Sequence, residues 1–533
     1  RAVERIRSFL HAADLPEGLA PAVTGSAAFG HDYAEAGEES HRRTLYVTLA
    51  AVVVILLAVY RAPVAAMIPL GAISLAAVVA MSVLGIASRF GLHVGTAERI
   101  FVFVLLYGAG TDYSLLLISR CREELQAGRG VAEATATGLD ATFGAILASA
   151  GTDAAGLLML VFAQYTIFRT TGPAVAIALL VALAAAVTLV PALLAVLGRG
   201  AFWPGTGPGR IGQRRLWPAV GRAVTARPGA VLLVVLVLLA IPAGRALDLT
   251  WVYDTLAEAT RPSGDRVANA AEGLEAARRH WPAGQTAPVR LLVRAGSPRP
   301  AAEWEQPAAD LTAAVLAVEG VEDVRSLTRP LGRDASPAAT ALIRSLAPER
   351  IRGEYVSADG RSTRLEVVLS APALTLDAMR NLGALCQAAR SAASRAGLDA
   401  EVLPAGATAE MADTRDITQR DFRRIAALVL GVIFVIVLML LRDAILTAFM
   451  VGSLVLGYLA TLGASYWVFT GLLGAAGLDW KVEVFLFVVI SAVGVDYNIF
   501  LAARFAQEAR AAPPRQAVRR AVVHTGPVIS SCG

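Results

Sequence analysis

The sequence predicts a polytopic α-helical membrane protein that carries an α+β domain outside the membrane and is built from two similar halves. Three observations support this fold class. Hydrophobic residues make up 56% of the chain and charged residues only 17%, and the apolar residues are gathered in long runs. One long segment of ordinary charge content interrupts these runs, and several motifs recur at a nearly constant spacing. A soluble enzyme with one globular core is excluded, because such long apolar runs belong in a bilayer.

Nine apolar runs are long enough to cross, or nearly cross, a bilayer core of ~30 Å as helices. Six runs contain no charged residue, namely 44–60, 62–88, 170–198, 228–244, 425–441 and 444–478. The other three contain one acid each, namely 100–119 with Asp112, 141–168 with Asp153 and 484–503 with Asp496. Residues 521–533 begin a tenth span.

Arginines in the links between the apolar runs predict which ends of the spans face the cytoplasm. The link 199–227 contains six arginines and no acid, and the link 504–520 contains five arginines and Glu508 as its single acid. Both links belong in the cytoplasm under the positive-inside rule, and alternating spans make the two assignments agree. The net charge of +5 is therefore a signal of topology, and we expect no nucleic-acid partner.

The segment 245–424 holds 23 Arg and 24 Asp or Glu and falls on the extracytoplasmic side. Alternating apolar and polar residues predict strands, and longer periodic stretches predict helices. The predicted order is strand 289–294, helix 301–318, strand 321–327, strand 363–370, helix 375–396 and strand 400–403. Two βαβ units in succession are typical of a ferredoxin-like domain, although two four-stranded pieces of another topology would also fit. Helical residues 266–280 and 338–352 would be insertions or arms.

Internal similarity links the two ends of the chain. Gly25, Ala28 and Asp32 recur at an offset of 381 as Gly406, Ala409 and Asp413. The segment that begins Gly110-Thr-Asp-Tyr recurs at an offset of 384 as Gly494-Val-Asp-Tyr. Such a pattern predicts two parallel repeats related by an axis along the membrane normal. The offset implies a twelve-span protein with six spans per half, of which this sequence would be a piece truncated at both ends.

These patterns divide the chain into six parts. They are 1–41, the end of a first extracytoplasmic domain; 42–198, spans 2–6; 199–227, a cytoplasmic arginine-rich link; 228–247, span 7; 248–422, a second extracytoplasmic domain; and 423–533, spans 8–10 and the start of span 11.

Two acids occupy equivalent positions inside membrane spans of the two halves. A carboxylate at membrane depth costs ~2.5–3.5 kcal/mol on insertion scales unless it is protonated or paired. Asp112 and Asp496 are each followed by a tyrosine, Tyr113 or Tyr497, whose hydroxyl can donate a hydrogen bond to a carboxylate. This pattern predicts a proton relay in which the two carboxylates face each other and each lies near the other's tyrosine. The alternative is a permanently hydrogen-bonded pair that only fastens the helices.

Small residues precede both acids. Gly108 and Gly110 lie before Asp112, and Gly494 lies before Asp496. Since glycine lets helix backbones approach closely in a membrane, we expect these residues to pack the two motif-bearing helices together.

Asp153 is a third acid within a span. It is either a further relay station, an acid that faces a water-filled cavity, or a protonated residue hydrogen-bonded to backbone between helices. Arg120 and Arg504 end their spans, where we expect them to anchor the helices at the interface. His524 begins its span at the same side and needs no functional role.

Motifs of catalysis and cofactor binding are missing from the sequence. The cysteines and histidines show no metal-binding spacing, and no Walker motif, nucleophile elbow or zinc signature is found. We therefore expect neither an enzyme nor a protein that holds a cofactor.

The doubled Gly-x-Asp-Tyr motif, each copy followed by Arg120 or Arg504, resembles the mycobacterial-membrane-protein-large (MMPL) family of the resistance–nodulation–division (RND) superfamily. The segment Arg120-Cys-Arg-Glu-Glu124 and the run 182–198 are also similar to that family. The resemblance implies a proton-motive-force-driven exporter of lipids or other hydrophobic molecules in the bacterial inner membrane. It also implies ferredoxin-like porter domains on the periplasmic side and assigns the relay to the two Asp-Tyr pairs. Asp153 departs from what the family leads us to expect.

The partners implied are protons, a hydrophobic substrate and membrane lipids, with an assembly anywhere from monomer to homotrimer. Two other functions use similar spans. One is a lipid receptor of Patched or sterol-sensing type, and the other is a Sec-associated helper of protein translocation. A receptor need not couple proton flux to the movement of cargo, whereas an exporter must.

Overall fold

The chain forms two compact units, of which unit 1 comprises Arg1–Ala36 and Val252–Ile417 and unit 2 comprises Gly37–Trp251 and Thr418–Gly533. The computed structural model describes residues 2–532 except 14–15, 17–18, 20, 61, 204–210, 254–269 and 334. The middle of the predicted arginine-rich link and the beginning of the predicted helix 266–280 therefore lie outside the described residues.

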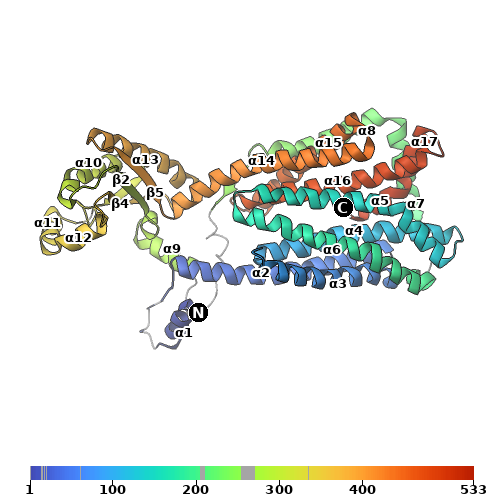
Figure 1. The fold of residues 1–533 in the computed structure, drawn as a ribbon, viewed down its shortest axis with the longest axis horizontal. Helices are drawn as coiled ribbons and strands as arrows, with labels where there is room; N and C mark the ends of the chain where they lie inside the picture. The colour runs from blue at the N-terminus through green and yellow to red at the C-terminus, as the bar shows by residue number, and fades with distance from the viewer. Residues whose placement is uncertain are drawn as a thin grey trace. The chain divides into compact units, whose positions relative to one another are not determined.

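Long apolar helices dominate the structure (Figure 1). In the part of the chain described, nine helices are long and apolar enough to cross a membrane, one for each apolar run. They are α2 (Ser26–Tyr60), α3 (Pro63–Ser88), α4 (Thr96–Gln126), α5 (Val131–Leu158), α6 (Thr166–Leu197), α8 (Pro228–Arg245), α14 (Ala407–Leu441), α15 (Ala444–Tyr466) and α16 (Lys481–Ala509). The protein is a multi-pass membrane protein.

Shorter elements connect or precede these spans. They are α1 (Ala2–Ala12), the 3-10 turns η1 (Met159–Phe162) and η2 (Gly198–Phe202), α7 (Ile211–Ala226), the π-helical turn η6 (Trp467–Leu472), the short strands β1 (Trp251–Val252) and β6 (Leu478–Asp479), and α17 (Pro514–Cys532).

Helices α2 and α14 begin well before their apolar runs. The runs begin at residues 44 and 425, but the helices begin at Ser26 and Ala407, because polar helix-forming residues continue the same backbone pattern. Each helix follows a glycine with positive φ, +105° at Gly25 and +102° at Gly406, which are left-handed conformations that glycine adopts without a Cβ clash. The start and end residues of α2 and α14 are both related by the offset of 381 found in the sequence.

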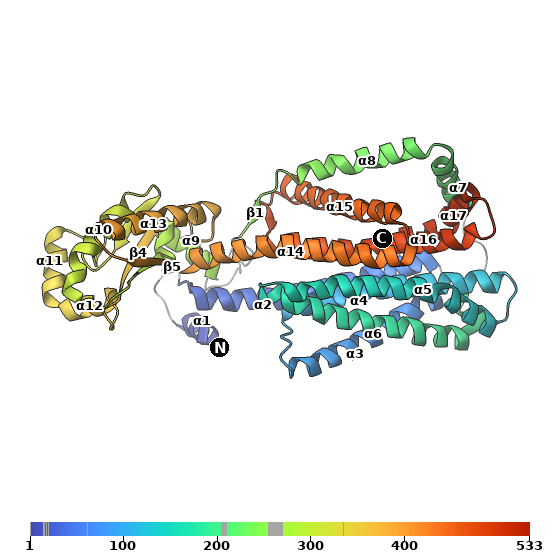
Figure 2. The same cartoon turned by 45° about the horizontal axis from the view of Figure 1, so that its top comes forward.

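The spans of unit 2 pack in two groups that meet at α5 (Figure 2). Helix α4, which carries the first Asp-Tyr motif, packs against α3, α5 and α6. Helix α16, which carries the second motif, packs against α5, α15 and α17. Helix α5 thus contacts both motif-bearing helices, while α8 packs against α15.

Large apolar side chains cover the outside of the spans. Val196 of α6 and Ile445 of α15 are each more than 80% exposed, and α8 buries none of its residues. Such surfaces are unfavourable in water but suit a hydrocarbon environment, in which lipid tails replace a protein core.

Helix α16 begins at Lys481, the single lysine of the sequence. Its backbone N–H donates to Asp479 Oδ1 at 2.7 Å, and its Nζ pairs with Asp479 Oδ2 at 2.9 Å. The same Nζ lies 5.4 Å from the ring centroid of Trp480. This local arrangement fixes the first turn of the helix that carries Asp496.

Unit 1 contains a four-stranded sheet in the strand order β3-β4-β2-β5, with every neighbouring pair antiparallel. The strands are β2 (Val289–Ala295), β3 (Val321–Arg325), β4 (Ser362–Leu369) and β5 (Ala400–Ala405). Helix α10 (Glu305–Leu316) connects β2 to β3, and α13 (Leu376–Arg395) connects β4 to β5. The two helices pack against each other beside the sheet (Figure 1).

The core of this sheet follows from the alternation of side chains. Burial alternates along β2, so that Val289, Leu291 and Val293 are buried and Arg290 and Arg294 are exposed. These valines and leucine join one apolar cluster with residues of α10 and α13. Trp304, which is fully buried, fills the centre of this cluster, and its ring N–H donates to the carbonyl of Gly360 at 2.9 Å.

A second, smaller apolar cluster in unit 1 joins α1, the start of α2 and α9 (Ala270–His280). The Asp32 carboxylate pairs with Arg7 at 2.6 Å and accepts the backbone N–H of Ala270 at 2.9 Å. The remaining elements of unit 1 are η4 (Ala283–Thr286), η5 (Ala301–Trp304), α11 (Pro337–Leu346) and α12 (Pro348–Tyr355).

Candidate functional site

The two Asp-Tyr motifs lie in the interior of unit 2. Asp112 and Tyr113 are on α4, and Asp496 and Tyr497 are on α16. Asp112 is 3% exposed, and both Asp496 and Tyr113 are fully buried. Tyr497 is half-buried. Both acids therefore lie among packed helices.

One hydrogen bond crosses between the two motifs. The Tyr497 hydroxyl donates to Asp112 Oδ2 at 3.4 Å, so the tyrosine of the second half meets the acid of the first. The hydroxyl of Tyr113 does not make the reciprocal bond to Asp496. It donates to Asp153 Oδ2 at 2.7 Å, because α5 packs between α4 and α16 and brings Asp153 to this point.

Asp153 is thus part of the same site. It is fully buried on α5, and both it and Asp112 lie within electrostatic range of Asp496. Within the described part of the chain, one oxygen of Asp153 and both oxygens of Asp496 have no hydrogen-bond partner of good geometry. Ser149, one turn before Asp153, also faces the carboxyl group of Asp496. We name Asp112, Asp153 and Asp496 the carboxyl cluster.

The carboxyl cluster has the chemistry of a proton-binding site. An ionised carboxylate in a low-dielectric interior is costly unless a cation or several donors compensate it. No ion pair to Asp153 or Asp496 is found among the residues that the structure describes. Like charges this close disfavour simultaneous ionisation, so the members of such a cluster share protons.

The three glycines predicted to pack the motif helices together do not do so. A Cβ at Gly108 would meet no described atom within 4 Å, and this residue is exposed. A Cβ at Gly110 would lie 3.2 Å from Ile73 on α3, and one at Gly494 would lie 3.2 Å from Leu454 on α15. The helices α4 and α16 instead meet through the long side chains of their Asp, Tyr, Glu and Arg residues, which need no close backbone approach.

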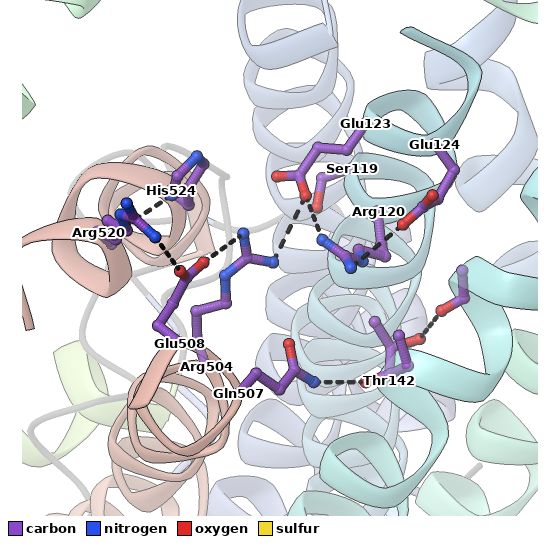
Figure 3. Close-up of polar contacts among 12 residues, drawn as sticks. Ser119, Arg120, Glu123, Glu124, Thr142, Arg504, Gln507, Glu508, Arg520 and His524 are labelled. Carbon is purple, nitrogen blue, oxygen red and sulfur yellow. Dashed lines mark hydrogen bonds and ion pairs between the residues drawn. The ribbon is translucent and has the colours of Figure 1, made fainter. Parts of the chain in front are cut away.

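A network of charges connects α4 and α16 at their C-terminal ends, which we call the arginine end (Figure 3). Glu123 of α4 accepts hydrogen bonds from Arg120 at 2.6 Å and from Arg504 of α16 at 3.5 Å. The Arg504 guanidinium lies between Glu123 and Glu508, and the pair with Glu508 is 3.2 Å long. Glu124 completes the network by pairing with Arg120 at 3.1 Å.

Sequence reasoning treated Arg120 and Arg504 as separate interfacial anchors and did not find this network. The repeat contained a signal of this network, because at the offset of 384 the residue of the second half that is equivalent to Glu123 is Gln507. The second half therefore lacks one carboxylate, and Arg504 reaches across to Glu123 of the first half. Gln507 donates instead to the backbone carbonyl of Ala141 on α5 at 3.2 Å.

Among the residues described, no group of three or more His, Cys, Asp or Glu side chains is arranged to hold a metal ion. Cys121 and Cys386 are buried free thiols.

In the part of the chain that the structure describes, nine apolar spans surround buried carboxyl groups, as in a multi-pass membrane protein. The MMPL family matches residues 1–231 and 262–533, and the chain belongs to this family of transporters.

Several relatives are similar to this chain, two of them over almost its whole length. The membrane protein SCO5905 of Streptomyces coelicolor is 32% identical, and the alignment covers 100% of this chain and 59% of that protein. The apo-petrobactin exporter of Bacillus anthracis is 26% identical over 97% of this chain and 67% of its own length. The sulfolipid-1 exporter MmpL8 of Mycobacterium tuberculosis is 33% identical over 60% of this chain and 29% of its own length. The chain thus spans about three fifths to two thirds of the first two relatives.

A solved structure shares the fold. The translocon-associated membrane protein SecDF of Thermus thermophilus superposes with a TM-score of 0.52, at 16% identity, over 95% of this chain and 56% of that protein. At this identity the likeness concerns the fold alone.

Proposed function

We propose that the protein is a proton-motive-force-driven exporter of lipids or other hydrophobic molecules. The observation that carries the proposal is the carboxyl cluster, in which acids from both motif-bearing helices and from α5 meet inside the membrane spans with two tyrosine hydroxyls. Protons bound here would change the charge of the cluster and hence the packing of the helices around it. Coupling to transport requires that the two conformations bind protons differently.

The relay comprises Asp112, Tyr113, Asp496 and Tyr497, with Asp153 as a third acid station. Tyr113 and Tyr497 each donate a hydrogen bond to a carboxyl group of the cluster. A tyrosine hydroxyl in this position can stabilise the ionised acid and pass a proton to it. This role for Asp153 is favoured over a purely structural one because Asp153 meets both a tyrosine hydroxyl and a second acid, Asp496, with which it can share a proton.

The distribution of arginines supports an orientation of the spans in the membrane. Arg120 and Arg504 lie at the arginine end, which we place in the cytoplasm under the positive-inside rule. In this proposal the membrane is the bacterial inner membrane, and the predicted extracytoplasmic segment 245–424 lies on its periplasmic side. The strand order and directions of the sheet of unit 1 suit a ferredoxin-like porter domain.

The organisation in two parallel six-span halves is part of the same proposal. It is supported by the equivalent ends of α2 and α14 and by the positive φ of Gly25 and Gly406. The substrate class is supported by the names of two relatives, which are exporters of a sulfolipid and of apo-petrobactin.

The relay is tested with the full-length protein in liposomes that enclose a pH-sensitive dye. Under an imposed pH gradient, Asp112→Asn and Asp496→Asn are expected to lower the proton flux to that of protein-free liposomes. Asp153→Asn is expected to do the same. Asp140→Asn, which changes an exposed acid on α5, is the matched control and should leave the flux unchanged. Full flux in the Asp112→Asn/Asp496→Asn double variant would contradict the relay.

Export is tested in cells. A strain that carries only the Asp112→Asn protein is expected to retain a lipid-soluble compound that the wild-type strain releases, measured by mass spectrometry of cell and medium extracts. A lipid receptor would give a different result, because binding would persist while no compound depended on the gene for its release.

A further inference from the structure

A small cavity lies at the arginine end of unit 2, beside the charged network. Its volume is about 50 Å³, and α4, α5, α16 and α17 contribute its lining. The uncharged polar residues and the histidine at its wall are Ser119, Thr142, Gln507, His524 and Thr525. A cavity of this size with several polar partners is large enough to hold water, whereas dry cavities are lined by apolar groups alone.

The cavity begins one helical turn from the carboxyl cluster. Leu116 lines it and follows Asp112 by four residues on α4. Phe500 lines it and follows Asp496 by four residues on α16. Four residues of helix correspond to ~6 Å, so only one layer of side chains separates the cavity from the buried acids.

The opposite side of the cavity carries the charged network (Figure 3). The charged groups at its lining are Arg120 and Glu123 of α4 and Arg504 of α16, while α5 contributes none. His524 of α17 lies at the same wall, and its Nδ1 is 2.8 Å from the backbone oxygen of Arg520. Arg520 in turn lies 3.9 Å from Glu508, which pairs with Arg504. The cavity therefore has buried acids on one side and interfacial charges on the other.

We propose that this cavity holds water and forms the cytoplasmic proton exit of the carboxyl cluster. Ser119, Thr142 and His524 would hydrogen-bond the water that carries the proton, and the Arg504–Glu123 pair would hold α4 and α16 at the distance that keeps the cavity open. The inference rests on the proposed function and adds a route to it. It also gives His524 and Ser119 a role that their sequence positions did not suggest.

The first test fills the cavity. Ala145 lines it from α5, so Ala145→Leu adds apolar volume where the water would lie. The expected result is a loss of proton flux to the level of Asp112→Asn in the same dye-loaded liposomes. Ala136→Leu makes the same change at an exposed position of α5 and should retain wild-type flux.

The second test does not depend on how well the Ala145→Leu variant folds. In a background with Ser at positions 121, 386 and 532, Ser119→Cys places a thiol at the cavity wall. Ag⁺ added on the cytoplasmic side, as an ion small enough to enter such a space, should block proton flux in this variant. The exposed Ser82→Cys control on α3 should stay insensitive.

The outcomes separate the two proposals. If Asp112→Asn abolishes flux while Ala145→Leu and the Ag⁺-treated Ser119→Cys variant conduct normally, the exit route is wrong and the relay stands. If the Asp112→Asn/Asp496→Asn double variant conducts normally, the proposed function itself fails.

Discussion

Asp421 is a buried carboxylate that lies outside the carboxyl cluster, and both of its oxygens accept hydrogen bonds. It lies on α14, is 1% exposed, and accepts the backbone N–H groups of Gln164 and Tyr165 at 2.8–2.9 Å. These two groups precede the first turn of α6, where unpaired N–H groups favour an acid. Satisfied Asp421 and unsatisfied Asp496 illustrate the difference between an acid that stabilises a helix and one that can exchange protons.

Replacement of Asp421 by alanine should destabilise the start of α6. The backbone N–H groups of Gln164 and Tyr165 would lose their acceptor, at a cost of about 1 kcal/mol each. The midpoint of thermal unfolding in detergent, followed by tryptophan fluorescence, is expected to fall for Asp421→Ala and to stay unchanged for Asp140→Ala. Equal midpoints for the two variants would show that the bonds to Gln164 and Tyr165 contribute little.

At the scale of elements, one glycine sets the contact between α8 and α15. A Cβ at Gly463 of α15 would overlap the carbonyl oxygen of Pro242 on α8 and lie 3.0 Å from the backbone nitrogen of Ala246. Backbone atoms cannot move aside as a flexible side chain can. Close backbone approach through glycine, which the sequence suggested for α4 and α16, is found instead between this other pair of helices.

Gly463→Ala is therefore expected to separate α8 from α15 and to lower the unfolding midpoint in detergent, by a cost of about 1–3 kcal/mol or more. Gly108→Ala is the matched comparison, since its Cβ would meet no atom within 4 Å, and it should unfold like the wild type. A larger loss for Gly108→Ala than for Gly463→Ala would overturn this account of the packing.

At the scale of the whole molecule, unit 1 has its own core. The cluster around Trp304 is built from the sheet and its helices and is separate from the small cluster at α1 and α9. The segment 287–412 contains all four strands and both connecting helices. It has what a soluble domain needs to fold without the membrane spans.

We expect residues 287–412, expressed alone, to be soluble and to unfold cooperatively in urea. Trp304→Ala should lower its stability by about 3–5 kcal/mol, because it leaves a large void and removes one of the two hydrogen bonds that the Gly360 carbonyl accepts. Leu346→Ala, at a side chain that is 74% exposed, should change stability by about 0.5 kcal/mol or less. A gradual, non-cooperative transition would mean that the spans are required for folding.

Periodicity and charge made much of this molecule predictable from its sequence. The nine spans and the order of strands and helices in unit 1 follow from local patterns of apolar residues. The bounds in unit 1 differ from prediction by a few residues, whereas α5 begins and ends ten residues before the predicted run 141–168. The early starts of α2 and α14 were not predicted, because hydropathy marks the lipid-facing part of a helix and not its whole length.

The site was predictable only in part, for a physical reason. Repeat spacing identified Asp112 and Asp496, but the bond from Tyr113 to Asp153 depends on which helix packs between α4 and α16. Likewise, whether Gly108 or Gly463 faces a neighbour depends on the rotation of each helix about its axis. Nearly uniform apolar composition around a span hides that rotation, so these contacts could not be inferred.

The single lysine at the start of α16 makes this sequence convenient for chemistry. Reagents that attack primary amines have one side-chain target in it, the Lys481 nitrogen that lies between Asp479 and the Trp480 ring. A dye or spin label attached there would report on the first turn of the helix that carries Asp496, with no need to introduce a cysteine. The rate at which this nitrogen reacts, compared at two values of pH, would reveal whether α16 shifts as the carboxyl cluster gains and loses protons.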